Sequence, residues 1–277
     1  SPAEEQIIHD EVQKLLNAGV IKECSSPWSS SLVLVRKPDG AWRVCSNYKL
    51  LNEVTIKDCY PLPRIDTILN ALQGATWFSA HDMTASFWQT SMDKEDGGTN
   101  GEVSSFLKTA FTTADGQFAW NKMPMGLLNA SAHQQRLMDR ILGTLAWKSV
   151  VCYVDDVTVY SNSFDQHLLD LRAFYTRMRQ AGMRLKPSKC HLARREINML
   201  GHAVDGDMRR AGAAKLKAVL DYARPTRIKH LRQFMGLTGY FLEYLPNYAT
   251  VSTPLRQLMA KKTTAKLGPR WTKAHED

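Results

Sequence analysis

The sequence predicts an α+β protein in which antiparallel strand pairs alternate with amphipathic helices. Two observations support this fold class. Apolar, β-branched runs come in pairs separated by short turns, and apolar residues recur at helical spacing between those pairs. With 277 residues, 44% of them hydrophobic, the chain is long enough for a sizeable core and for two or three subdomains.

In the N-terminal part, apolar residues at helical spacing over 8–16 predict a helix that ends at Gly19. Residues 32–35 and 41–45 flank a Pro-Asp-Gly turn and predict a β-hairpin. Basic residues surround the tip, which fits either a solvated turn or a cationic clamp for phosphates. Apolar residues over 65–72 predict a second, short helix.

The middle of the chain predicts a buried strand over 76–83 and an exposed loop over 91–105, where polar residues and glycines gather. Within that loop, residues 97–105 should lie outside the core. A second hairpin signal covers 109–122. A helix is then predicted to open at the Met-Pro-Met-Gly segment over 123–126 and to run to about residue 142.

The apolar run over 150–160 carries two adjacent acids, Asp155 and Asp156. Its Val, Tyr and Thr residues predict two short strands with a tight turn at the aspartates. Burying two like charges is costly, and a bound Mg²⁺ or Mn²⁺ would compensate, because oxygen ligands suit these ions. The plain alternative is a hairpin with a solvated Asp-Asp turn, since Asp is a common turn residue.

Beyond this run, residues 168–178 predict a long amphipathic helix, and 196–204 predict two short strands that bend at Gly201. From residue 211 onward the pattern is helical and basic, so that about 207–262 reads as a separate helical unit.

Composition narrows the classes of function. A net charge of +9 and a pI near 9.3 fit a polyanionic partner such as nucleic acid. The five cysteines include no C-x-x-C pair, which argues against a disulfide framework or a zinc site and favours reduced, intracellular thiols. No apolar run approaches the roughly 18 residues that a membrane span needs.

Six segments, in order and at compatible spacing, resemble the reverse transcriptases of gypsy-class LTR retrotransposons and their retroviral relatives. They are the hairpin at 35–43, the strand at 78–83, Met-Pro-Met-Gly-Leu-Leu-Asn-Ala at 123–130, Tyr-Val-Asp-Asp at 153–156, Leu-Gly-His at 200–202 and the helical stretch 231–247. One such segment is weak evidence, whereas six together argue against chance similarity.

The resemblance implies a right-hand polymerase fold with fingers, palm and thumb. The fingers would comprise 1–57 and 91–129, the palm 58–90 and 130–206, and the thumb 207–262, with 263–277 as a linker toward a missing connection and RNase H region. It also implies an RNA-directed DNA polymerase, also DNA-templated, that extends a primer with dNTPs by two-metal phosphoryl transfer using Mg²⁺ or Mn²⁺. The expected partners are an RNA or DNA template with primer and a downstream RNase H domain, with no membrane, in a cytoplasmic retroelement particle.

The resemblance assigns roles residue by residue. Asp82 and Asp155 would be metal ligands, with the Met83 carbonyl, and Asp156 would tune the charge beside the primer end. The residues expected to contact the incoming nucleotide are Lys37, Arg43, Phe87, Met125 and Gly126, with Phe87 beneath the sugar. The expected primer grip is Met199, Leu200, Gly201 and His202. Lys189 is a candidate general acid that would protonate pyrophosphate.

The chain departs from the family pattern at Ser86, where Gly is usual, at Asn47 and Lys49, where Asp and Arg are usual, and at Ser131, where Pro is usual. Residues 97–105 resemble an insertion. None of these changes removes a metal ligand, but they leave open a catalytically weakened domain that only binds template–primer. A Mg²⁺-dependent nuclease is a third possibility, against which the nucleotide-binding residues argue.

Overall fold

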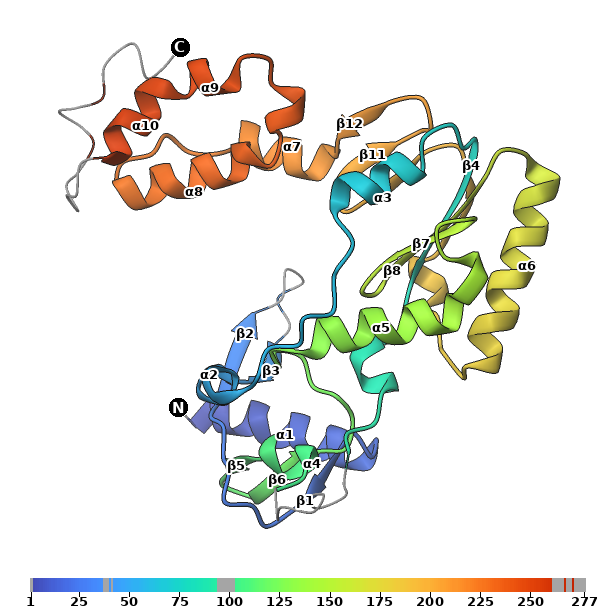
Figure 1. Ribbon diagram of the computed structural model, residues 1–277. Helices are drawn as coiled ribbons and strands as arrows, with labels where there is room; N and C mark the ends of the chain where they lie inside the picture. Colours follow the sequence, from blue (N-terminus) through green and yellow to red (C-terminus); the bar gives the residue numbers. More distant parts are fainter. Residues whose placement is uncertain are drawn as a thin grey trace.

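The computed structural model describes residues 2–36, 40, 42–93, 103–260, 267 and 271. At its centre lies a four-stranded antiparallel sheet with the strand order β7-β8-β4-β9. Its strands are β4 (Trp77–Asp82), β7 (Val150–Tyr153), β8 (Asp156–Ser161) and β9 (His191–Arg194). Figure 1 shows this sheet between one unit that carries the N-terminus and another formed by the C-terminal helices.

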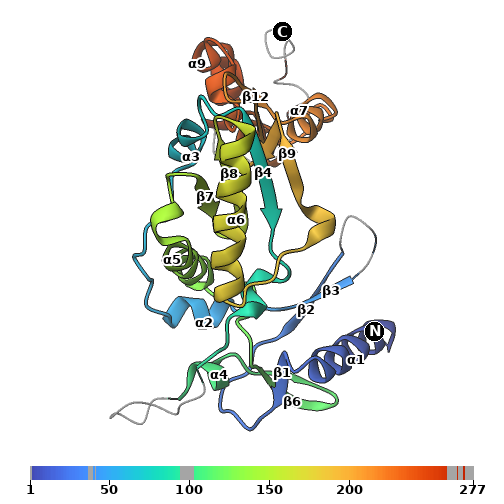
Figure 2. The ribbon, with the colours of Figure 1, turned by 90° about the vertical axis from the view of Figure 1, so that its right-hand side faces the viewer.

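Both faces of the central sheet are covered. Helices α5 (Ala130–Leu142) and α6 (Phe164–Gln180) pack on one face, where Val150 and Cys152 point. Helix α3 (Ile65–Ala71) and the strands after β9 cover the other face, where Val151 points. Since alternate side chains enter two separate cores, nearly every position of β7 is apolar, which explains the unbroken apolar run in the sequence. Figure 2 shows α6 lying along this sheet.

The register of the sheet brings acids together. Asp82, the last residue of β4, is directly opposite Asp156, the first residue of β8. Tyr153 pairs with Asp156, so Val154 and Asp155 form the turn between β7 and β8. The predicted hairpin with its turn at the aspartates is therefore confirmed.

The N-terminal unit has its own core, in which Val12, Ile21, Phe111, Phe118 and Trp120 are buried. Its elements are α1 (Pro2–Asn17), β1 (Ile21–Glu23), β2 (Leu32–Arg36), β3 (Trp42–Ser46), α2 (Lys49–Val54), α4 (Ser105–Lys108), β5 (Phe111–Thr113) and β6 (Gly116–Trp120). Strands β1, β6 and β5 form one sheet, and β2 and β3 form the predicted hairpin. A short 3₁₀ turn, η1 (Ser86–Gln89), follows β4.

The C-terminal unit begins with a small sheet and continues as helices. The sheet contains β10 (Ile197–Met199), β11 (His202–Val204) and β12 (Arg209–Ala211). The helices are α7 (Ala213–Leu220), α8 (Ile228–Gly239), α9 (Tyr248–Val251) and α10 (Thr253–Ala260), with η4 (Leu242–Tyr244) as a 3₁₀ turn. Two other 3₁₀ turns lie next to the central sheet, η2 (Gly143–Leu145) before β7 and η3 (Pro187–Lys189) before β9. Of the helices described, none is both long and apolar enough to cross a membrane.

Two predicted boundaries were wrong. The helix expected to open at 123–126 begins at Ala130, because Gly126 adopts φ 95°, a left-handed conformation that a helix cannot contain. The helix expected from residue 211 begins only at Ala213, because Arg209–Ala211 form strand β12, which pairs with β11. Arg210 in β12 forms ion pairs with Glu196 (2.5 Å) and Asp205 (2.8 Å), which fasten this strand to the sheet.

The expected exposed loop over 91–105 was also partly wrong. Its C-terminal end enters the fold, since Ser104 is buried and its hydroxyl accepts a hydrogen bond from the Leu107 N–H at the start of α4. Residues 94–102, which hold most of the proposed insertion, lie outside the described residues.

Candidate active site

Three carboxylates gather where β4 ends and β8 begins. The backbone carbonyl of Asp82 accepts a hydrogen bond from the Lys186 N–H at 2.9 Å, which fixes the end of β4. The Oδ2 atom of Asp82 lies 3.0 Å from the Lys189 ammonium, which η3 supplies. Asp156 faces Asp82 across the sheet, and Asp155 precedes it in the turn. Met83, the residue after Asp82, is buried.

The electrostatics of this cluster favour a cation. Burial raises the pKa of Asp155, and the neighbouring Asp82 charge raises it further. The pKa of Asp156 is also raised, first by burial and then by Asp155 and Asp82. Lys189 opposes both shifts but does not cancel them. The carboxylates therefore carry more negative charge than the lysine compensates.

The donor chemistry fits hard divalent ions, since every candidate ligand is an oxygen. Within the described ranges, however, no three Asp, Glu, His or Cys side chains converge in a way that could hold an ion. In this arrangement the Lys189 ammonium neutralises the Asp82 carboxylate. The donor atoms thus fit a hard cation in chemistry and in charge, and Lys189 lies against Asp82.

A cleft of about 280 Å³ connects the acids to the strand that was predicted to grip the primer. The cleft is lined by Asp82, Asp156 and Lys189 and, from β10, by Asn198 and Met199. The cleft therefore joins one predicted metal ligand, Asp82, to Met199 of the predicted primer grip.

His81, the residue before Asp82, also borders this cleft. Burial lowers the pKa of His81 to about 4, so this imidazole is neutral at neutral pH. Its Nε2 atom lies 2.9 Å from the Tyr175 hydroxyl of α6. A neutral ring adds no charge of its own to the acids beside it.

The predicted primer-grip turn is held from the C-terminal unit. Leu200 and Gly201 both have positive φ (51° and 83°), which is strained for leucine. The Tyr240 hydroxyl donates to the Leu200 carbonyl. The Nδ1 atom of His202 lies 2.7 Å from the Tyr244 hydroxyl, and the His202 ring packs on Tyr240 at 4.8 Å between centroids.

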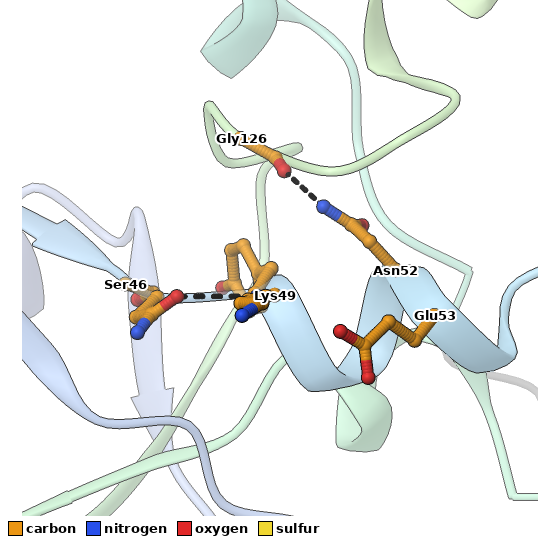
Figure 3. A pocket seen from close by; sticks show the side chains of 7 residues that line it. Ser46, Lys49, Asn52, Glu53 and Gly126 are labelled. Atoms are coloured by element: carbon orange, nitrogen blue, oxygen red, sulfur yellow. Dashed lines mark hydrogen bonds between the residues drawn. The ribbon is translucent and has the colours of Figure 1, made fainter. Parts of the chain in front are cut away.

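The predicted nucleotide-binding residues occupy the N-terminal unit and η1. Gly126 lies against α2, where its carbonyl accepts a 2.9 Å hydrogen bond from Asn52, and both border a pocket of about 550 Å³ (Figure 3). Met125 and Arg43 are exposed, and Phe87 is half-buried in η1. Lys37 lies outside the described residues. The structure thus gathers Asp82, Asp156, Lys189 and Met199 around one cleft, while Gly126 lies beside α2.

Two of the unusual residues fit their surroundings. The side-chain oxygen of Asn47 accepts a 3.2 Å hydrogen bond from the Lys49 N–H at the start of α2, in the same pocket wall. Ser86, where Gly is usual, is buried at the start of η1.

Gln135 was missed by the sequence reasoning. It is 1% exposed and lies on the buried face of α5 with Met138 and Leu142. Its side-chain oxygen accepts a 2.9 Å hydrogen bond from the Val154 N–H, in the turn between β7 and β8. The signal in the sequence was a polar residue on an apolar helical face, because a buried amide is almost always hydrogen-bonded.

Comparisons with known proteins show the family of this chain. Residues 35–204 match the family model for reverse transcriptase (RNA-dependent DNA polymerase). The chain is 38% identical over 261 residues to the retrovirus-related Pol polyprotein from transposon 297 of Drosophila melanogaster, covering 92% of this chain and 24% of that protein. It is 28% identical to the transposon Tf2-3 polyprotein of Schizosaccharomyces pombe, covering 100% and 20%. The chain therefore spans about a quarter or less of these relatives.

Solved structures support the fold. The foamy viral protease-reverse transcriptase in complex with double-stranded DNA aligns with a TM-score of 0.87 and 24% identity, covering 98% of this chain and 46% of that one. The same viral protein in complex with an RNA/DNA hybrid aligns with a TM-score of 0.83 and 22% identity, covering 100% and 36%. The right-hand polymerase fold is thereby confirmed, and with more than half of its length matching the family model, this chain belongs to the reverse transcriptases, the RNA-dependent DNA polymerases.

Proposed function

We propose that this domain extends a primer with dNTPs on an RNA template, and also on a DNA template, at the site formed by Asp82, Asp155 and Asp156. The observation that carries the proposal is the cleft that joins Asp82 and Asp156 to Met199, with Asp155 next to Asp156 in the β7–β8 turn. A primer end held at β10 would meet the acids there. Relatives of the fold bind double-stranded DNA and an RNA/DNA hybrid, which supports template–primer as the partner.

Two divalent ions, Mg²⁺ or Mn²⁺, would be held by Asp82, Asp155 and the Met83 carbonyl, and they would supply Lewis acids for the primer hydroxyl and the triphosphate. Asp156 would keep the site negative and lie beside the primer end. The raised pKa values of Asp155 and Asp156 support this assignment, because a cation relieves the repulsion that raises them.

The remaining residues would bind, orient and donate a proton. The primer 3′-oxygen attacks the α-phosphate, and pyrophosphate leaves with the electrons of the broken bond. Lys189, whose ammonium is already beside Asp82, would give a proton to that leaving group. Contacts to the nucleotide would come from Lys37, Arg43, Phe87, Met125 and Gly126, and Met199, Leu200, Gly201 and His202 would place the primer.

The family match does not favour a weakened domain that only binds template–primer. Because the relatives are retrotransposon polyproteins, the proposal extends to a downstream RNase H domain and to a cytoplasmic retroelement particle as the working context.

The test is extension of a labelled DNA primer on RNA and DNA templates of one sequence, with dNTPs and with Mg²⁺ or Mn²⁺. We expect extension by the wild type on both templates and none by Asp155→Asn or Asp82→Asn. Both variants should still bind template–primer, because phosphate contacts elsewhere dominate that affinity. Near-normal extension by either variant would refute the metal assignment, and template cleavage without dNTPs would indicate a nuclease.

A further inference from the structure

The turn that carries Asp155 has an unusual backbone. Val154 adopts φ 59°, in the left-handed region, although it is β-branched and buried. Gly, Asn and Asp adopt this conformation readily, whereas for valine it is a genuine outlier. The turn therefore needs contacts from outside itself to keep its shape. Since Asp155 follows Val154 directly, those contacts also decide where the Asp155 carboxylate lies.

Gln135 supplies the first contact. Its Oε1 atom accepts from the Val154 N–H at 2.9 Å, and its Nε2 atom donates to the Cys152 carbonyl at 3.2 Å. The same Nε2 donates to Oδ1 of Asp139 at 3.0 Å, one helical turn further along α5. The amide of Gln135 thus holds both the end of β7 and the first residue of the turn, and Asp139 fixes the direction in which that amide points.

Asp139 is in turn held by the segment that joins α2 to α3. The Tyr60 hydroxyl donates to Oδ2 of Asp139 at 2.5 Å. This bond raises the pKa of the Tyr60 hydroxyl, which keeps it a donor at neutral pH. Because the acceptor is a carboxylate, the bond belongs to the stronger, charge-assisted class.

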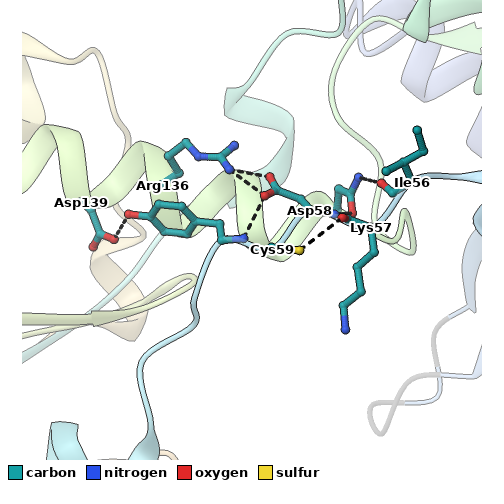
Figure 4. A network of polar contacts seen from close by, with 8 residues as sticks. Ile56, Lys57, Asp58, Cys59, Arg136 and Asp139 are labelled. Carbon is teal, nitrogen blue, oxygen red and sulfur yellow. Dashed lines mark hydrogen bonds and ion pairs between the residues drawn. The ribbon is translucent and has the colours of Figure 1, made fainter.

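The joining segment is itself fastened to α5. The Arg136 guanidinium contacts both carboxylate oxygens of Asp58 at 2.7 Å, as Figure 4 shows. The guanidinium also lies over the Tyr60 ring, 4.7 Å from its centroid. The side chain of Asn129 accepts from the Asp58 N–H and donates to the Ile56 carbonyl, both at 2.9 Å. Tyr60 is therefore held in place by Arg136 and Asp58.

We propose that Tyr60, Asp139 and Gln135 are positioning residues for the catalytic turn, which they hold through a chain of hydrogen bonds that runs from the α2–α3 segment to the Val154 N–H. This inference rests on the proposed polymerase function. None of the three needs to touch substrate. Their effect is to keep the Asp155 carboxylate where chemistry requires it, so that they act on the rate of the chemical step more than on binding.

The test is single-nucleotide, single-turnover extension by Tyr60→Phe, which keeps the ring over Arg136 and removes only the hydroxyl. We expect the maximum rate to fall about tenfold, the effect of about 1.4 kcal/mol in the barrier, while the Kd values for dNTP and template–primer change less than about twofold. Tyr160→Phe is the matched control, because it also removes one tyrosine hydroxyl. Tyr160 lies in β8, and its hydroxyl donates to the Trp147 carbonyl at 2.8 Å, outside the chain of bonds that leads to Val154. This control should keep the wild-type rate.

A double-mutant cycle tests whether the effect passes through Gln135. Gln135→Met should slow the chemical step, and adding Tyr60→Phe should slow it no further, since the chain is already broken. If Gln135→Met does not fold, Asp139→Leu takes its place in the cycle. A wild-type rate for Tyr60→Phe, an equal loss in the Tyr160→Phe control, or multiplying effects in the cycle would each overturn the inference. Failure of the wild type to extend any primer would instead refute the proposed function.

Discussion

Replacing Asp156 with Asn should stabilise the metal-free protein while it sharply reduces primer extension. Burial disfavours the charged form of Asp156, and the Asp155 and Asp82 carboxylates disfavour it further, so that its pKa is raised in the folded state. A carboxyl whose pKa is raised by folding lowers stability at neutral pH, where it must be ionised. An amide of the same shape removes that penalty.

The size of this stabilisation follows from the pairing of Asp156 with Asp82 in the sheet. Opposed residues of an antiparallel pair have Cβ atoms about 4.5–5.5 Å apart. Like charges about 6 Å apart in a water-like medium repel by about 0.7 kcal/mol. Two acidic neighbours therefore contribute about 1.4 kcal/mol, and Lys189 offsets about half of it. Because Asp156 is exposed and solvent screens its charge, we expect a net gain of about 0.5 kcal/mol, or about 1–2 °C in Tm.

Differential scanning calorimetry in a chelating buffer measures this gain. The advantage of Asp156→Asn should be present at about pH 7 and shrink toward about pH 4, because the wild-type carboxyl then becomes protonated and neutral. Adding Mg²⁺ at about ten times its Kd should stabilise the wild type by about 1.4 kcal/mol. The variant should gain less, because its site carries one negative charge fewer, so that its advantage over the wild type shrinks. A lower Tm for the variant in chelator would refute the reasoning from like charges.

Asp205→Asn is the control, because this substitution should change the stability in the opposite direction. The Met208 N–H donates to the Asp205 side chain at 2.8 Å, and this bond, followed by the Arg210 charge, lowers the pKa of Asp205. Its charged form therefore contributes stability that is present at neutral pH and lost as the pH falls through the lowered pKa. The amide should consequently lower Tm at neutral pH.

Three further outcomes are expected. Gly206→Ala should cost about 3–4 kcal/mol in urea unfolding, since φ is +89° and the new Cβ would lie 1.9 Å from the Ala75 carbonyl oxygen. Gly182→Ala, with φ +67° and no atom within 4 Å of the Cβ, should cost only about 1–2 kcal/mol, and equal losses would contradict the predicted clash. Phe87→Val should stay folded and lower the ratio of kcat/KM for dNTP over rNTP, while an unchanged ratio in an active variant would remove Phe87 from the site. Template–primer affinity should fall steeply with salt and with similar slopes for unrelated sequences, as titrations by fluorescence anisotropy would report, whereas a flat response would contradict phosphate binding by the basic surface.

Sequence patterns predicted those parts of the fold around the site that are formed by residues close together in the chain. The β7–β8 hairpin follows from its β-branched residues, and a hairpin fixes its own register once the turn is known. Pairing with β4 then places Asp82 opposite Asp156. Helix α6 was equally visible, because its apolar side chains follow one period over its whole length. The hairpin and α6 needed no information from distant residues, whereas the pairing of β8 with the distant strand β4 was not predicted.

Distant contacts decided what could not be predicted. The segment before α5 is apolar enough to continue a helix, but Asn129 instead bonds to residues 56 and 58, and Gly126 turns the chain toward α2. Gln135 and Tyr60 act through partners that are 19 and 79 residues away, a separation that no periodicity reveals. The roles of the nucleotide-binding residues likewise come from the family resemblance and stay predictions.

Contacts around the Leu200–Gly201 turn connect the predicted primer grip to the C-terminal helices, so that the two should move together. Tyr240 holds the Leu200 carbonyl, Tyr244 holds His202, and the Gly212 N–H donates to the Gly201 carbonyl at 3.0 Å. If these helices are the thumb of the proposed polymerase and follow the duplex, a product of the wrong width would have to move this turn or break these bonds. Either movement would shift a primer end held at the turn away from Asp82 and Asp156. The proposed site would then respond to the shape of the duplex that it has extended.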